Sequence, residues 1–197
     1  MIYLFGFNSV ARAVAEELDT ERKLEYKFVM HRKFYNAQTE FQNDRSIIIY
    51  EEARFTSKDS IVNCVGYKNL CARVEVGETL RTCGAKLMTF VSTRACISTN
   101  ARIGCGIVFL GDVVVERGAH IGDHGLLWGG ARICHDAKIG RGVFLAAGAI
   151  VGGFAEISDY CAVGFNSVIR DHARVPNNTK IKALSYFGHS GIRRHHD

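Results

Sequence analysis

Hydrophobic residues recur at every sixth position over the C-terminal half of the chain. Fifteen consecutive positions in steps of six, from Ile97 to Ile181, hold only Ile, Leu, Val or Phe. Such a period fits neither an α-helix nor the alternation of an ordinary β-strand. It predicts a solenoid in which each hexad is one short strand with a corner. Three hexads close one coil, so the fifteen anchors predict a parallel β-helix of about five coils.

Two further positions of the hexad are restricted. The residue two places before each anchor is mostly small, as in Ala95, Ala101 and Ala119. Gly directly follows five anchors, at Gly104, Gly122, Gly140, Gly152 and Gly164. We expect the anchors to point inward, the small residues to fit near tight turns, and Gly and Asn to supply the positive φ of the corners. Stacked coils lie about 4.8 Å apart, so a residue three hexads later lies on the same face, one coil along.

The first ninety residues have a different pattern. Apolar segments at 2–5, 26–30, 46–50, 60–66 and 86–90 predict strands, and 10–18 and 70–83 predict helices. Strands that alternate with helices indicate a small parallel, Rossmann-like α/β sheet. We therefore expect an α/β domain over 1–90, a β-helix over 91–182 and a C-terminal tail over 183–197.

The turns after the predicted strands are candidate ligand contacts. Ligands of parallel α/β sheets bind beyond the carboxyl ends of the strands. This rule brings together Gly6, Phe7 and Asn8 with Arg32 and Gly66. The first turn lacks the G-x-G-x-x-G pattern, so we expect no dinucleotide cofactor.

Composition excludes several classes of protein. The chain has 197 residues, of which 47% are hydrophobic and 23% are charged, as in ordinary globular proteins. The net charge of +5 comes from scattered Lys and Arg, which favours a solvated surface over nucleic-acid binding. Seven cysteines match no zinc or redox spacing, and there is neither a signal-peptide pattern nor a membrane-spanning apolar segment. We expect a cytoplasmic protein with reduced thiols and no bound metal.

The hexad pattern resembles that of the hexapeptide-repeat acyltransferases. With its α/β domain, the whole chain is similar to sugar acyltransferases related to sialic acid O-acetyltransferases and bacterial nucleotide-aminosugar N-acetyltransferases. The resemblance is strongest at Val-Gly-Tyr 65–67, Leu-Trp-Gly-Gly 127–130, Ile-Cys-His-Asp 133–136 with Ile-Gly 139–140, Val-Gly-Phe-Asn 163–166 and Ile-Arg-Asp 169–171. It implies a left-handed β-helix, a homotrimer, acyl-CoA as co-substrate and a nucleotide sugar held by the α/β domain.

The resemblance also assigns a catalytic site. Acyl transfer needs a base for the nucleophile and a donor for the oxyanion, and histidine suits the base role. In relatives, the histidine four residues before an Ile-Gly pair is the catalytic base, which here is His135. Asp136 could orient the imidazole or stabilise its charge. One coil beyond His135 lies Gly153, whose matching N–H in relatives binds the thioester carbonyl.

Coenzyme A in this family lies in the groove between neighbouring β-helices, near the C-terminal coils. The matching contacts are Gly164, Asn166, Lys180 and Lys182, with the lysines placed for phosphate.

The chain departs from the family at three places. Residues 6–9 read Gly-Phe-Asn-Ser where relatives have Gly-Gly-His-Gly, and the tail lacks the usual Gly-x-Pro-Ala ending. The positions that match a second active-site histidine hold Phe144 and Gly148.

Three alternatives stay open. A zinc-dependent hydratase of the γ-carbonic-anhydrase kind would need three convergent histidines, for which His120, His124 and His135 are available. A catalytically silent scaffold or binding protein is the second, favoured by the departures from the family. The third is nucleophilic catalysis by Cys134, which directly follows an anchor at a place often taken by Gly.

Overall fold

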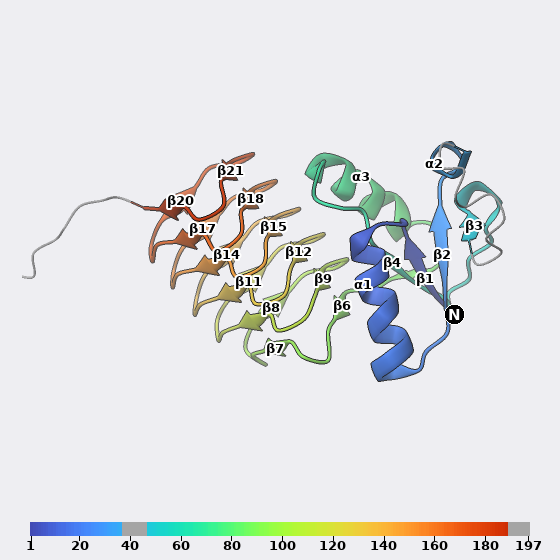
Figure 1. The fold of residues 1–197 in the computed structure, drawn as a ribbon, viewed down its shortest axis with the longest axis horizontal. Helices are drawn as coiled ribbons and strands as arrows, with labels where there is room; N and C mark the ends of the chain where they lie inside the picture. The colour runs from blue at the N-terminus through green and yellow to red at the C-terminus, as the bar shows by residue number, and fades with distance from the viewer. Residues whose placement is uncertain (37–46, 189–197) are drawn as a thin grey trace, which may run out of the picture.

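The structure is a computed structural model, and it describes residues 1–36 and 47–188. A five-stranded parallel sheet lies in the N-terminal part, and from Phe90 the chain winds into a stack of coils that extends away from it (Figure 1). No helix within the described ranges has the length and apolar character needed to cross a membrane.

The N-terminal sheet has β1 at its centre. Its strands run in the order β3-β2-β1-β4-β5, and every neighbouring pair is parallel. Their bounds are β1 Ile2–Phe5, β2 Tyr26–Met30, β3 Ile47–Ile49, β4 Ser60–Asn63 and β5 Lys86–Leu87. The carboxyl end of β1 is therefore flanked by those of β2 and β4, which is where the predicted ligand turns begin.

Three α-helices accompany this sheet. They are α1 Ser9–Glu17, which continues into a π turn at Leu18–Arg22, α2 Arg32–Asn36 and α3 Leu70–Arg81, with a 3-10 turn at Tyr50–Glu52. Asn8 begins α1, because its side-chain oxygen accepts hydrogen bonds from the N–H groups of Val10 and Ala11. Asn69 begins α3 in the same way through the N–H of Ala72. Both helices thus start at an N-cap residue of a preferred type.

The coils form three flat faces, each a parallel sheet. The domain face comprises β6 Phe90–Val91, β9 Val108–Phe109, β12 Leu126–Leu127, β15 Phe144–Leu145, β18 Ala162–Val163 and β21 Lys180–Ile181. The apolar face comprises β7 Cys96–Ile97, β10 Val114–Val115, β13 Arg132–Ile133, β16 Ile150–Val151, β19 Val168–Ile169 and β22 Tyr186–Phe187. The charged face comprises β8 Arg102–Ile103, β11 His120–Ile121, β14 Lys138–Ile139, β17 Glu156–Ile157 and β20 Arg174–Val175.

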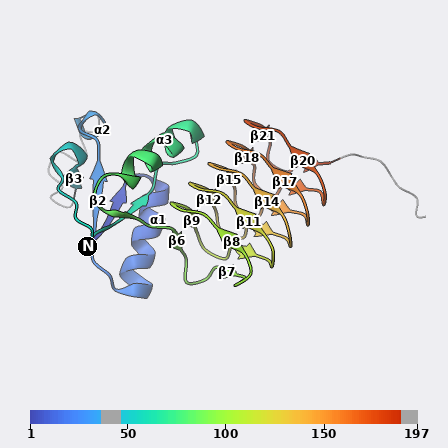
Figure 2. The same ribbon diagram turned by 180° about the vertical axis from the view of Figure 1, so that it is seen from behind.

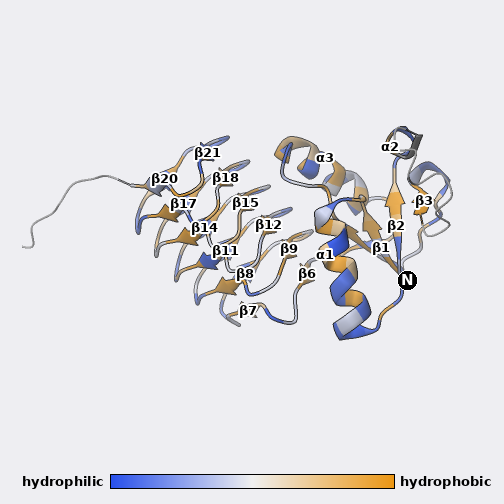
Figure 3. Ribbon diagram, viewed as in Figure 1, coloured by the Kyte–Doolittle hydropathy of each residue, from blue (hydrophilic) through white to orange (hydrophobic). Residues whose placement is uncertain are grey.

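The hexad anchors fill the inside of the β-helix. The second residue of each strand is the anchor, and Ile121, Leu127 and Ile133 are fully buried. Strands pair in register with the strand one coil along, as in Ile121 with Ile139, so anchors stack on anchors. The first residue of each strand points outward and gives each face its character. The mixture of hydrophobic and hydrophilic positions along every coil is visible in Figure 3.

The glycines after the anchors have a different role from the one predicted. Positive φ occurs at the third residue after the anchor, at Gly118, Gly130, Gly142 and Gly148 but also at non-glycine residues such as His124 and Asp136. The glycines directly after the anchors lack positive φ. A Cβ at Gly164 would lie 2.4 Å from the backbone nitrogen of Ala183 in the next coil. The glycines directly after the anchors are therefore explained by the close stacking of coils and not by a need for positive φ.

The α/β domain packs on the domain face through α1. Val10 and Val14 of α1 share one core cluster with Leu4 of β1 and with Leu126 and Phe144 of the coils. Both views place α1 between the sheet and the coils (Figures 1 and 2). The opposite side of the sheet has a separate cluster around Phe5, Val29, Ile61 and Leu80.

A buried arginine fastens this junction. Arg73 of α3 is fully buried, and its guanidinium donates to the carbonyl oxygens of His124 and Gly125 in the coils at 2.8 and 3.0 Å. It also donates to the carbonyls of Asn63 and Val65 at the end of β4. Burial lowers the pKa of Arg73 to about 10. One side chain thereby holds the end of β4, α3 and one corner of the β-helix together.

Three local predictions need correction. The segment 86–90 is not one strand, because Lys86–Leu87 joins the α/β sheet while Phe90 begins β6 in the domain face. The stretch predicted as a loop around Arg32 starts the short helix α2. Strand β22 pairs with β19, so the stacking continues beyond residue 182 into the segment predicted as a tail. Residue 46 of the predicted third strand and residues 189–197 of the tail lie outside the described residues.

Candidate active site

His135 lies at the corner between the apolar face and the charged face. It follows β13, and its backbone N–H donates to a carboxylate oxygen of Glu116 at 2.9 Å. Glu116 belongs to the coil before it, so two coils fix the position of the histidine backbone. The imidazole remains accessible, with 42% of its side chain exposed. An exposed imidazole on a rigid corner is suited to proton transfer with a bound ligand.

Asp136 is bonded to its neighbour within one corner. Its Oδ2 lies 3.1 Å from His135 Nδ1, a contact that the extended geometry of a strand would not favour. The positive φ of Asp136 turns the backbone so that the two side chains meet. A carboxylate can only accept, so in this contact Nδ1 carries the proton. The lone pair of Nε2 is then available, which is the protonation pattern a general base needs.

Gly153 lies directly over the imidazole. A Cβ at this position would be 2.9 Å from both Nε2 and Cε1 of His135, so only Gly leaves the ring in place. The carbonyl of Gly153 accepts from the His172 N–H at 3.0 Å. Within residues 1–36 and 47–188, the Gly153 N–H donates to no other backbone group. An exposed imidazole and the backbone of Gly153 therefore lie against each other at one corner.

Two aromatic rings extend this corner, and sequence reasoning missed both. Phe154 stands edge-on to His135, with ring centroids 5.1 Å apart. His172 stacks on Phe154 at 5.0 Å. Asp136, Phe154 and His172 are successive members of one column, spaced by three hexads. The spacing that led from His135 to Gly153 would have found them had it been applied to Asp136.

The other predicted CoA contacts lie at a different corner or face of the same copy. Gly164 and Asn166 follow β18 at the corner between the domain face and the apolar face, and Lys182 follows β21 at the same corner. The N–H of Gly164 already donates to Ile181 within the sheet. Lys180 is exposed on the outward side of β21. These residues do not join His135 within one copy of the chain.

The predicted acceptor contacts do gather at the carboxyl ends of β1, β2 and β4. Gly6 ends β1 with φ +121°, and Gly66 has open space where a side chain would extend. The side chain of Asn8 is already occupied, since it caps α1 and donates to the Cys64 carbonyl at 2.8 Å. Arg32 pairs with Glu52, and Arg12 lies over the ring of Phe7.

A second group of aromatic side chains lies where the two domains meet. Tyr67, after β4, stacks face to face on Phe144 with centroids 4.2 Å apart. Trp128 stands edge-on to both rings. Phe144 is nearly fully buried, so the place of the family's second histidine is filled by a packed ring.

One group of potential metal ligands occurs in the described ranges. Atoms of Glu78, Asp123 and His124 lie within 4.8 Å of one another. Arg81 pairs with both carboxylates, at 3.2 and 3.1 Å, and so supplies the positive charge there. His124 is fully buried, so it cannot be a ligand shared between copies. This network connects α3 to the coils, and His135 is not part of it.

Cys134 lacks the features of a nucleophile. Burial and the charge of Glu116 raise the pKa of its thiol, which lowers the thiolate fraction near neutral pH. Its backbone N–H donates to Val151 in the next coil. These contacts are those of a structural residue.

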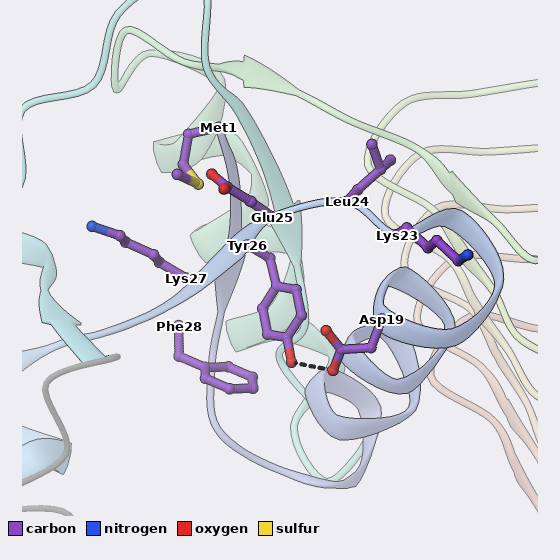
Figure 4. A pocket seen from close by; sticks show the side chains of 8 residues that line it. All are labelled: Met1, Asp19, Lys23, Leu24, Glu25, Tyr26, Lys27 and Phe28. Atoms are coloured by element: carbon purple, nitrogen blue, oxygen red, sulfur yellow. Dashed lines mark hydrogen bonds between the residues drawn. The ribbon is translucent and has the colours of Figure 1, made fainter.

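A surface hollow of about 520 Å³ lies at the opposite end of the α/β sheet (Figure 4). It is lined by the amino ends of β1 and β2, including Met1 and Tyr26, and by Asp19 and Lys23 after α1. Ligands of such sheets bind at the carboxyl ends, so this hollow is not the predicted acceptor site.

Comparison with solved structures gives clear likenesses. The acetyltransferase domain of PglB from Neisseria gonorrhoeae FA1090 matches with a TM-score of 0.82 and 21% identity, over 95% of this chain and 90% of that one. WeeI from Acinetobacter baumannii AYE matches with a TM-score of 0.68 and 17% identity, over 94% and 95%. A variant of perosamine N-acetyltransferase from Caulobacter crescentus, in complex with CoA and GDP-perosamine, matches with a TM-score of 0.50 and 17% identity, over 94% and 90%.

No protein-family model and no curated protein sequence matches the chain. At these identities the structural likenesses establish the fold, and they fit the left-handed β-helix that the resemblance implied.

Proposed function

We propose that the protein is an acyl-CoA-dependent N- or O-acyltransferase that acts on a nucleotide-linked aminosugar or a related sugar, with acetyl as the expected acyl group. The observation that carries this proposal is the corner at which His135, bonded to Asp136, lies directly against Gly153. Two of the similar structures are named as acetyltransferases, and one of them holds CoA and GDP-perosamine, which supports the substrate classes.

The proposed chemistry is direct transfer. The acceptor amine or hydroxyl attacks the thioester carbonyl carbon while His135 Nε2 takes its proton. The Gly153 N–H donates to the oxygen that becomes negative, and Asp136 stabilises the imidazolium. The tetrahedral intermediate then loses the C–S bond, and the departing thiolate recovers the proton from the imidazolium. No acyl-enzyme forms, and Cys134 has no part in the step.

A homotrimer would complete this site. The outward residues of the apolar face include Ile150 and Tyr186, which are 37% and 63% exposed. His135 and Phe154 border this face at one corner, and Gly164 and Lys182 border it at the other. A second copy packed on the apolar face brings the two corners of different copies together, with acyl-CoA between them. In this arrangement the α/β domain holds the acceptor beyond the carboxyl ends of β1, β2 and β4.

Assembly is tested by light scattering and sedimentation. The wild type is expected to be a trimer, and Tyr186→Glu to be smaller and inactive. Arg102→Glu, on the charged face, is the control and should keep the trimer. A fully active monomer would contradict the shared site.

Two observations favour a silent scaffold instead. Phe144 fills the place of a second histidine and is packed under Tyr67, and the Asn8 side chain is already bonded. If the protein is a silent scaffold, it should bind no acyl-CoA.

A thermal-shift screen against acyl-CoAs and nucleotide sugars decides between the two. A ligand at a hundred times its Kd adds about 2.7 kcal/mol of stability, which is easily measured. With substrates named in this way, His135→Ala should lower kcat by about a hundredfold or more, the usual worth of a positioned base. His120→Ala is the control, an exposed histidine on the charged face. An unchanged kcat in His135→Ala removes that residue from the base role.

A further inference from the structure

Phe154 places a bulky aromatic side chain at a corner with positive φ, next to His135. It occupies a corner with φ +57°, a conformation that bulky residues rarely adopt. Five other corners of the β-helix hold Gly at the same hexad position, while Tyr160 and Leu184 share the conformation of Phe154. The ring is also 48% exposed, so little burial offsets the strain. A strained and exposed aromatic residue beside a reactive histidine points to a role in function.

The surroundings of Phe154 fix its ring against the proposed reaction centre. Phe154 directly follows Gly153, and its ring meets that of His135 edge-on at 5.1 Å. His172 covers one side of the ring at an interplanar angle of 7°. The Phe154 N–H donates to the His135 carbonyl at 3.1 Å, so the backbone here is held between two coils. The exposed part of the ring is therefore a rigid apolar surface beside the site.

We propose that Phe154, supported by His172, is the acyl-specificity surface, and that the enzyme accepts acyl groups longer than acetyl. This inference rests on the proposed function. A thioester carbonyl held by the Gly153 N–H, with its carbon near His135 Nε2, has the ring of Phe154 as a neighbour of its acyl substituent. The ring has no polar atom, so it suits a hydrocarbon chain better than the amide-rich pantetheine arm. Within one copy of the chain, no residue closes off the exposed edge of the ring at the size of a methyl group.

The expected preference follows from the area available. A methylene fully removed from water is worth roughly a factor of four in affinity. On a half-exposed ring we expect about a twofold gain for each methylene, so butyryl-CoA should bind roughly fourfold more tightly than acetyl-CoA.

Isothermal titration with CoA, acetyl-CoA, propionyl-CoA and butyryl-CoA tests the proposal without an acceptor. For the wild type, affinity should rise about twofold with each added methylene. Phe154→Leu should keep part of this increase, and Phe154→Ala should bind all three esters with equal affinity. Tyr160→Ala is the matched control, because Tyr160 is an aromatic residue with φ +58° at another corner, beside Arg141. It should keep the full increase of the wild type.

The outcomes separate the two proposals. A wild type that binds neither CoA nor its esters contradicts the proposed function. A wild type that binds CoA but shows no preference among the esters overturns the acyl surface alone. Equal weakening of every ligand, CoA included, in Phe154→Ala also overturns it, because the ring would then serve the pantetheine arm.

Discussion

In the β-helix, the neighbours of a residue are set by its place in the hexad, whereas in the α/β domain they are set by contacts between distant segments. Ile133 meets Val115 and Val151 because these residues are three hexads away on either side. Arg73 instead meets Asn63, Val65, His124 and Gly125, which no local pattern relates. Equivalent residues of successive coils therefore have similar surroundings, whereas the surroundings of Arg73 occur once in the molecule.

The largest effect is expected at the junction. Arg73→Met removes the guanidinium donor from four carbonyl oxygens, of which that of Gly125 keeps another donor, the Val108 N–H. We expect a loss of about 3–5 kcal/mol in the free energy of unfolding. Urea unfolding should then show two transitions, because the α/β domain is released from the coils. Arg81→Met, on the same helix but in surface ion pairs, should cost about 1 kcal/mol or less. Equal losses in the two variants would refute the junction role.

Two adjacent glycines separate stacking from chemistry within one coil. A Cβ at Gly152 meets the Asp171 backbone nitrogen at 2.4 Å, so Gly152→Ala should cost about 1–3 kcal/mol of stability. The nearest atoms to a Cβ at Gly153 belong to the His135 ring, which can rotate. Gly153→Ala should therefore unfold like the wild type but lose about a hundredfold in kcat through misplacement of the imidazole. Thermal unfolding and steady-state kinetics measure the two effects. A Gly153→Ala variant that loses stability but keeps its kcat would contradict the proposed role of Gly153.

The cap of α1 gives a smaller effect. Asn8→Ala removes two cap bonds and the bond to the Cys64 carbonyl, and we expect a loss of about 1 kcal/mol or slightly more. Asn69→Ala removes a single cap bond of α3 and should cost less. Urea unfolding compares them. If Asn8→Ala leaves stability unchanged but abolishes nucleotide-sugar binding, the side chain is a ligand contact rather than a cap.

The smallest effect concerns alkaline pH. Burial, followed by the hydrogen bond to Asp19, raises the pKa of Tyr26 from 10.0 to about 12 (Figure 4). The folded chain thus holds this proton more tightly than the unfolded chain. Its contribution to stability is complete below the unfolded pKa and is lost as pH rises through the folded value. Tyr26→Phe should show a weaker fall in unfolding free energy between about pH 10 and pH 12 than the wild type. Identical pH profiles would contradict the shift.

The sequence is sufficient for the repeat but not for the contacts between domains. The six-residue period predicts the inward anchors and, by counting coils, the meeting of His135 and Gly153. It gives the wrong reason for Gly152 and Gly164, because positive φ and close stacking both favour Gly and the sequence alone does not distinguish them. The sequence also does not indicate that residues 86–90 divide between two sheets, because both halves of the segment have the composition of a strand.

The junction could not be predicted from patterns of this kind. Arg73 lies in a helix with only ordinary amphipathic spacing, and nothing local indicates that its side chain is buried. The stacking of Tyr67 on Phe144 joins segments that are far apart in the chain. By contrast, the column of Asp136, Phe154 and His172 could have been found by the same counting that found Gly153.

The regular stacking of the coils also determines how the molecule can change in length. Adding or removing one whole coil keeps the anchors inside and leaves each later strand on its own face, whereas adding a single hexad would move every later strand to the next face. The distance from the α/β domain to the His135 corner can thus change only in steps of about 4.8 Å. The number of coils between the α/β domain and His135 therefore sets their separation. A substrate that contacts both must be long enough to span that distance.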